Sequence, residues 1–220
     1  MSLHVLTPSN LQEPTRPQGK LFDSWEGIGA ALLLVTVSPV VAASAVALRI
    51  ISGRSPFVAH LRMAQYGKQL WMLKLRTMWS QEPSSPHERG LVERIVAEPA
   101  YEIKDPADPR VGSRFASFCR RHSIDELPQL LHVVRGEMSL VGPRPLTRGE
   151  LNRHYGPLAP RLLSVKPGMT GLWQVQGRSD IGWKERIELD LQMVEQTSRK
   201  DYFSILLRTV SALARGNGAC

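Results

Sequence analysis

The stretch that decides the fold is GIGAALLLVTVSPVVAASAVAL, residues 27–48. It runs for 22 residues without a charged side chain, which is long enough for a helix to cross a bilayer core of about 30 Å. Its middle is Ser38-Pro39. A proline inside a helix removes one backbone hydrogen bond and clashes with the preceding turn. We therefore expect a kink there, with the Ser38 hydroxyl bonded to a freed carbonyl.

A kink divides the stretch into two arms of about 11 residues, each roughly 17 Å long and too short to span a bilayer. Basic residues lie on both sides: Arg16, Lys20, Arg49, Arg54 and Arg62. The positive-inside rule then suits both ends on the cytoplasmic face. The pattern favours a re-entrant membrane helix-hairpin over residues 21–52. A single-pass anchor, a secretory signal sequence and a buried core helix remain as alternatives.

The remaining composition indicates one folded domain with anionic partners. The chain has 220 residues, 42% hydrophobic and 22% charged, values typical of a globular protein. A proline-containing tail is expected over residues 1–20, and the main domain over residues 53–220. The net charge of +8 suits nucleic acid, anionic lipid or phosphorylated substrates equally. Two cysteines without zinc-site spacing favour a reducing, cytosol-facing location.

Periodicity predicts a mixed α/β fold that is mostly helical. A short strand is expected over residues 70–78, with Lys74 and Arg76 on one face. Residues 80–99 read as a loop around a short charged helix near residues 92–96. Further helices are expected at residues 115–121, 126–134, 183–194 and 202–214. The last has a broad apolar face, typical of an amphipathic helix at a membrane interface.

The stretch Arg120-Arg121-His122-Ser123-Ile124-Asp125-Glu126 holds adjacent carboxylates after two arginines. Asp125 and Glu126 could bind a divalent cation and supply a nucleophile beside a positive pocket. The same letters also fit a plain capping box, Ser123 to Glu126. Pro128 disfavours a regular helix that begins at Ser123, because the proline would cost it a backbone bond.

Two glycine- and proline-rich stretches follow. In residues 136–145 the prolines on either side of Arg144 stiffen the backbone, so its guanidinium could clamp a phosphate bidentately. Residues 166–178 combine glycines, amides and cations, which suits a phosphate or sugar loop. Each stretch could equally be a surface turn or connection.

Four motifs occur in a fixed order: KLRTM, SIDELPQL, MSLVGPRPL and KPGMTGLWQVQGR. This ordered set resembles the monotopic phosphoglycosyl transferases, bacterial sugar transferases that begin polysaccharide and glycoconjugate assembly. The resemblance covers nearly the whole chain, from about residue 20 to about residue 210, and includes the Ser38-Pro39 pair. It implies transfer of a sugar 1-phosphate from a nucleotide diphosphate sugar, expected to be a UDP-sugar, to polyprenyl (undecaprenyl) phosphate.

The resemblance also implies residue roles. Asp125 attacks the β-phosphate and forms a phosphosugar-aspartyl intermediate, and Glu126 completes a dyad that binds Mg²⁺. Arg120, Arg144 and Lys74 lie at the substrate phosphates. The protein is expected on the cytoplasmic face of the bacterial inner membrane, in contact with its lipids. Whether it forms a homodimer is left open. The GLWQVQGRS stretch favours a hexose such as galactose as the transferred sugar.

A rival function is a non-catalytic, membrane-tethered module that binds nucleic acid or another anion through its basic surface. The chain has no nucleic-acid motif with spaced aromatic residues, and its most distinctive motif holds paired carboxylates. Both observations disfavour the rival, so no nucleic-acid partner is expected.

Overall fold

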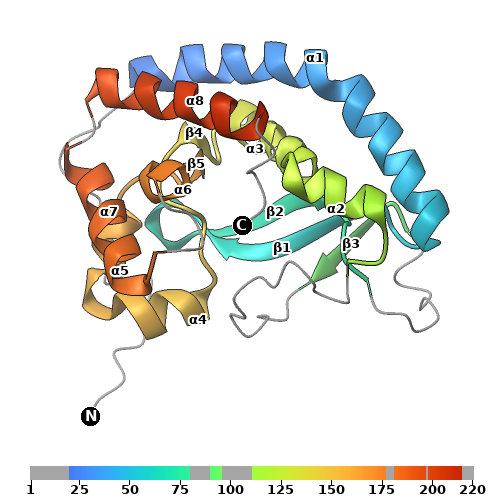
Figure 1. The fold of residues 1–220 in the computed structure, drawn as a ribbon. Helices are drawn as coiled ribbons and strands as arrows, with labels where there is room; N and C mark the ends of the chain where they lie inside the picture. The colour runs from blue at the N-terminus through green and yellow to red at the C-terminus, as the bar shows by residue number, and fades with distance from the viewer. Residues whose placement is uncertain (1–19, 80–89, 96–110, 177–180, 197, 215–220) are drawn as a thin grey trace.

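One long helix, α1 (Lys20–Ser52), runs over the whole upper side of the domain and bends past its midpoint (Figure 1). The computed structural model describes residues 20–79, 90–95, 111–176, 181–196 and 198–214. Nearly all of the tail predicted for residues 1–20 lies outside these ranges. The described part is mostly helical with two small sheets, which confirms the prediction of a mixed α/β, mostly helical fold.

The bend in α1 has the cause predicted from Ser38-Pro39. Proline has no N–H to give to the carbonyl four residues before it, and for Pro39 that carbonyl belongs to Val35. The Ser38 hydroxyl donates to the Val35 carbonyl instead, at 2.8 Å. The helix is therefore bent rather than interrupted, and its backbone stays satisfied through the kink.

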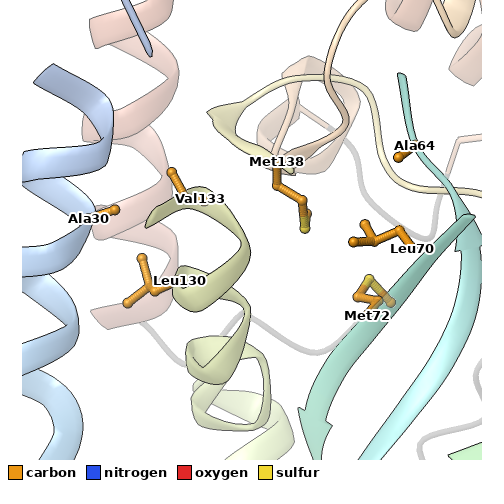
Figure 2. Close-up of a cluster of buried hydrophobic side chains, with 7 residues drawn as sticks. All are labelled: Ala30, Ala64, Leu70, Met72, Leu130, Val133 and Met138. Atoms are coloured by element: carbon orange, nitrogen blue, oxygen red, sulfur yellow. The ribbon is translucent and has the colours of Figure 1, made fainter. Parts of the chain in front are cut away.

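Both arms of α1 pack against the same domain. Before the kink, Ala30 is buried against Leu130 and Val133 of α3 (Leu130–Val134), as Figure 2 shows. After the kink, Ala45 and Leu48 are buried against residues of other elements. The opposite side of α1 is exposed and apolar; its exposed residues include Ile28, Leu32, Val35, Val46 and Ile50.

Among the described residues, Trp25–Ser52 forms the one helix long and apolar enough to cross a membrane. Core helices and signal sequences can share that length and composition. The exposed apolar side of α1 contradicts the core-helix alternative, because a core helix buries its large apolar side chains.

The larger sheet lies below α1 in the strand order β2-β1-β3. Strand β1 (Phe57–Met63) pairs antiparallel with β2 (Gln69–Leu75) and parallel with β3 (Val92–Ile95). A 3₁₀ turn, η2 (Gln65–Gly67), joins β1 to β2. The strand predicted over residues 70–78 is confirmed up to Leu75.

The helix predicted near residues 92–96 is wrong. Residues 92–95 form strand β3, whose neighbour β1 supplies the pairing that the local sequence did not reveal. Val92 and Ile95 are β-branched and suit a strand. Residue 96 lies outside the described ranges.

Helix α2 (Arg114–Arg121) confirms the helix predicted at residues 115–121. The helix predicted over residues 126–134 is present in two parts, a 3₁₀ helix η4 (Ile124–Gln129) followed by α3. Figure 2 shows α3 between α1 and strand β2, with Met138, Leu70 and Met72 on the inner side. The core therefore has three layers here: α1, α3 and the sheet.

A second, two-stranded sheet pairs β4 (Ser139–Val141) with β5 (Gly168–Thr170) in parallel. Short helical turns not predicted from the sequence lie between these strands: α4 (Arg148–Glu150), η5 (Leu151–Tyr155), η6 (Gly156–Leu158) and α5 (Ala159–Leu162). Helices α6 (Leu172–Gln176), α7 (Trp183–Gln196) and α8 (Arg199–Ala214) follow. The last two confirm the helices predicted at residues 183–194 and 202–214.

Helix α8 lies along the first half of α1 (Figure 1). It buries Tyr202 and Ile205 in the domain and exposes Phe203, Leu207 and Val210. Exposed apolar side chains therefore occur on both α1 and α8, as expected of helices at a membrane interface.

Candidate active site

Asp125 and Glu126 lie in the first turn of η4, directly after α2. Ser123 joins the two helices in the left-handed conformation, with φ of 52°, and its side chain makes no capping bond. The capping-box alternative for this motif is therefore wrong. Because Glu126 does not cap its own helix, its carboxylate can pair with a residue from another element.

That partner is Lys74 of β2. The Lys74 ammonium donates to a Glu126 carboxylate oxygen at 2.6 Å, and the two side chains are 15% and 24% exposed. The residues are 52 positions apart in the chain, and η4 packs against β2 to bring them together. The structure thus joins two of the five predicted site residues in a partly buried ion pair.

Asp125 is 8% exposed and lies close to Cys119 of α2. Burial, with a smaller contribution from the charge of Asp125, raises the pKa of the Cys119 thiol to about 11. The thiol is consequently neutral at physiological pH. Since thiolates are the reactive form of cysteine, Cys119 does not compete with Asp125 as a nucleophile.

Cations gather on the face of the sheet that carries Lys74. His60 of β1 has its pKa lowered to about 4, first by burial and then by Arg62, Lys74 and Arg76. Arg76 is fixed in place, since it donates to the Ser55 carbonyl at 2.9 Å and pairs with Glu93 of β3. The face is positive beside the dyad, as a site for an anionic substrate requires.

Arg144 lies in the turn that follows β4. Gly168 donates from its backbone to the Pro143 carbonyl at 2.8 Å, and a side chain on Gly168 would collide with the backbone of Gly142. The glycines of these two motifs therefore allow the close approach that holds the turn. This explains why the MSLVGPRP and KPGMTG motifs need glycine where they have it.

The Arg144 guanidinium carbon lies 6.0 Å from the Trp173 ring centre. Asp190 of α7 is 2% exposed and accepts a hydrogen bond from the Tyr155 hydroxyl at 2.5 Å. It lies near enough to Arg144 for the guanidinium charge to act on the pKa of Asp190 in the lowering direction. Within the described part of the chain Arg144 makes no ion pair. A half-buried guanidinium in this position suits an incoming phosphate.

The five predicted site residues therefore fall in three places. Asp125, Glu126 and Lys74 form one group. Arg120 is half-buried in the last turn of α2, five positions before Asp125. Between the described residues, neither Arg120 nor Arg144 makes a direct bond to the dyad. Their predicted contact with substrate phosphates remains a prediction.

The dyad fits one mode of Mg²⁺ binding. Among the described residues no group of three or more His, Cys, Asp or Glu side chains could hold a metal ion. Mg²⁺ is often held by only one or two carboxylates together with substrate phosphates. Asp125 and Glu126 can supply those carboxylates, so these two residues fit an Mg²⁺ ion that is held jointly with a bound phosphate group.

The model of the family described as bacterial sugar transferase matches residues 20–216. The chain belongs to this family. It is similar to the exopolysaccharide production protein ExoY of Sinorhizobium fredii, with 36% identity over 202 residues that cover 89% of this chain and 86% of that protein. This confirms the family predicted from the four motifs.

Two longer proteins are also similar to this chain. The UDP-galactose-lipid carrier transferase of Erwinia amylovora is 39% identical over 168 residues, 76% of this chain and 35% of that protein. The undecaprenyl-phosphate galactose phosphotransferase of Salmonella typhimurium is 35% identical over 170 residues, with the same two shares. The chain thus spans about a third of the length of these two relatives.

The buried charged residues of α7 that lie near Arg144 were not identified from the sequence. Arg186 and Asp190 lie four residues apart on α7 and are both buried with Met193. Charged residues at the spacing of a buried helix face were the available signal. Arg186 lies 4.7 Å from the Trp173 ring and donates to the Ile181 carbonyl at 3.0 Å.

Proposed function

We propose that this sugar transferase moves a sugar 1-phosphate from a UDP-sugar to undecaprenyl phosphate through a covalent intermediate on Asp125, and so initiates polysaccharide or glycoconjugate synthesis. The observation that carries the proposal is the dyad of buried Asp125 and partly buried Glu126, with Glu126 bonded to Lys74 on a cationic face of the sheet. The printed names of the relatives, which include a UDP-galactose-lipid carrier transferase and an undecaprenyl-phosphate galactose phosphotransferase, support it.

In the first half-reaction a carboxylate oxygen of Asp125 attacks the β-phosphorus. The bond from that phosphorus to the oxygen bridging the two phosphates breaks, and nucleoside monophosphate leaves with the bridging oxygen. The sugar phosphate stays on Asp125 as an acyl phosphate. Repulsion between carboxylate and diphosphate opposes this step, and the cations Lys74, Arg120 and Arg144 reduce it.

In the second half-reaction an oxygen of the lipid phosphate attacks the same phosphorus. The bond to Asp125 breaks, the carboxylate is regenerated and the sugar is left on a polyprenyl diphosphate. When bound at Asp125 and Glu126, Mg²⁺ would supply further neutralisation of the diphosphate charge. The Lys74 ammonium, bonded to Glu126 at 2.6 Å, orients that carboxylate beside the attacking group.

The lipid acceptor requires the site to lie at the membrane surface. Both arms of α1 pack on the domain that carries Asp125, while the outer side of α1 and part of α8 are exposed and apolar. This arrangement supports a monotopic placement at the cytoplasmic face. A straight span would require one arm to leave the domain and expose its buried contacts.

Isotope exchange tests the chemistry. With a UDP-sugar and labelled UMP but no lipid, the wild-type enzyme should move label into the UDP-sugar, because the first half-reaction is reversible and needs no acceptor. Asp125→Asn should abolish exchange with the folded structure intact. Absence of exchange in an enzyme that still makes the lipid product would refute the covalent intermediate. Inactivity with every nucleotide sugar would favour the nucleic-acid module.

Cysteine labelling tests the topology. With Cys119 and Cys220 replaced, single cysteines at Ser9 in the tail and at the exposed Gln69 should both be shielded from an impermeant thiol reagent in intact cells. Both should react after the inner membrane is permeabilised. Labelling of either position from outside would contradict the re-entrant arrangement.

A further inference from the structure

Glu26 is a buried carboxylate at the edge of the membrane helix, one residue before the uncharged stretch begins. It is 5% exposed. One of its oxygens, Oε1, accepts hydrogen bonds from the Ser139 hydroxyl at 2.7 Å, from the Leu140 backbone N–H at 3.1 Å and from the Tyr202 hydroxyl. These donors come from β4 and α8, which lie 113 or more residues later in the chain.

A carboxylate in this position has to be held by the domain. Burial of an ionised group without hydrogen bonds costs several kcal/mol, and charged groups within membrane helices face protein and pair with it. One helical turn later Ala30 packs in the same cluster as Met138, directly before Ser139. Two successive turns of α1 therefore lie on residues 138–140.

The contacted strand leads straight into the Arg144 turn. Ser139 is five positions before Arg144, and the intervening backbone is bound to β5: Gly142 donates to the Thr170 carbonyl at 2.9 Å and Gly168 donates to the Pro143 carbonyl at 2.8 Å. The turn thus has two attachments. The attachment to β5 holds it within the catalytic domain, and the attachment to Glu26 holds it to the membrane helix.

We propose that Glu26 is a positioning residue that fixes the Arg144 turn at a set height relative to the membrane helix. At that height the turn is placed correctly for the phosphate group of the lipid acceptor. This inference rests on the proposed function, since it requires a lipid acceptor. It assigns the two attachments of the turn to different half-reactions. The β5 attachment serves the soluble nucleotide sugar, and the Glu26 attachment serves the lipid acceptor.

The test compares Glu26→Leu with Glu26→Gln in full-length enzyme reconstituted in vesicles. Leucine leaves three donors without their acceptor, and the loss of hydrogen bonds to a charged group predicts that the KM for undecaprenyl phosphate rises about tenfold. Label exchange between UMP and the UDP-sugar should stay within about twofold of the wild-type rate. Glutamine keeps an oxygen that can accept all three donors, so it should restore most of the lipid KM.

Thr36→Val is the matched control. Thr36 lies on the same helix, and among the described residues its hydroxyl bonds only to the Leu32 carbonyl, at 2.9 Å within α1, so neither assay should change. The double variant Ser139→Ala, Tyr202→Phe removes the two hydroxyl groups that donate to Glu26. It should raise the lipid KM as Glu26→Leu does, and adding Glu26→Leu should not raise it further, since coupled residues are non-additive.

Three results would overturn the proposal: an unchanged lipid KM in Glu26→Leu, an equal loss of label exchange, or fully additive effects in the triple variant. The second result would assign Glu26 to folding of the site alone. If Glu26→Leu does not fold, the double variant carries the test. Failure of the proposed function is a separate outcome, because the wild type would then show neither label exchange nor lipid product.

Discussion

Replacement of Lys74 by methionine should cost both stability and activity. Methionine keeps most of the apolar length of the side chain and removes the ammonium that bonds Glu126 at 2.6 Å. Exposed ion pairs contribute about 0–1 kcal/mol, and loss of one partner from a buried pair costs about 3–5 kcal/mol. The pair is 15% and 24% exposed, so we expect a loss of about 1.5 kcal/mol, between these limits.

For a chain of this size that loss should lower Tm by about 5 °C. The matched control is Arg161→Met, because Arg161 pairs with Glu195 where the side chains are 54% and 42% exposed. Its Tm should change by less than about 2 °C. Thermal unfolding of the two variants in the same detergent measures the difference.

The double variant Lys74→Met, Glu126→Gln separates stability from catalysis. It should recover most of the lost stability, because no charge is left without its partner. Its transfer rate should stay about 100-fold or more below wild type, since a charge beside the reacting phosphates is still missing. If Lys74→Met loses no more stability than Arg161→Met, the Lys74–Glu126 ion pair does not hold the dyad in place.

Three further predictions follow from other parts of the molecule. Arg144→Lys should lower kcat/KM about tenfold or more despite the retained charge, because lysine cannot clamp a phosphate bidentately; near-normal kinetics would favour an incidental turn. Pro39→Ala restores an N–H for the Val35 carbonyl and should straighten α1, lowering transfer to lipid while label exchange persists; an unchanged lipid rate would argue against a role for the bend. Burial raises the pKa of Asp190 to about 7 from its ordinary 3.8, so the wild type should lose stability relative to Asp190→Asn as pH rises from about 4 through about 7; parallel Tm curves across that range would refute the shift.

The sequence predicted the elements whose signal is local. The bend at Ser38-Pro39 follows from the chemistry of one proline and one hydroxyl, and the Val35 carbonyl accepts as that chemistry requires. Helices α7 and α8 follow from the spacing of their apolar residues. Asp125 and Glu126 were candidates from the sequence because two adjacent carboxylates follow two arginines within one motif.

Elements that depend on distant partners were missed. Residues 92–95 became a strand because β1 pairs with them, and no local pattern reveals a neighbour 35 positions earlier in register. The capping-box alternative could not be excluded from the sequence for the same reason. The Glu126 carboxylate bonds Lys74, which lies 52 residues away in the chain, instead of capping its own helix. Tyr155 and Asp190 likewise meet only in the folded chain.

The position of α1 connects these local and distant effects. A straight membrane span would leave only one arm on the domain, so either Ala30 would leave α3 or Ala45 and Leu48 would leave the cluster with Leu75 and Ala116. Each arm buries apolar side chains whose exposure would cost about 25 cal/mol per Å². The bend lets both arms keep their contacts while the outer side of α1 stays apolar. In the proposed arrangement, the same serine and proline that determine the helix geometry hold Asp125 on one side of the bilayer, where a lipid phosphate can reach it.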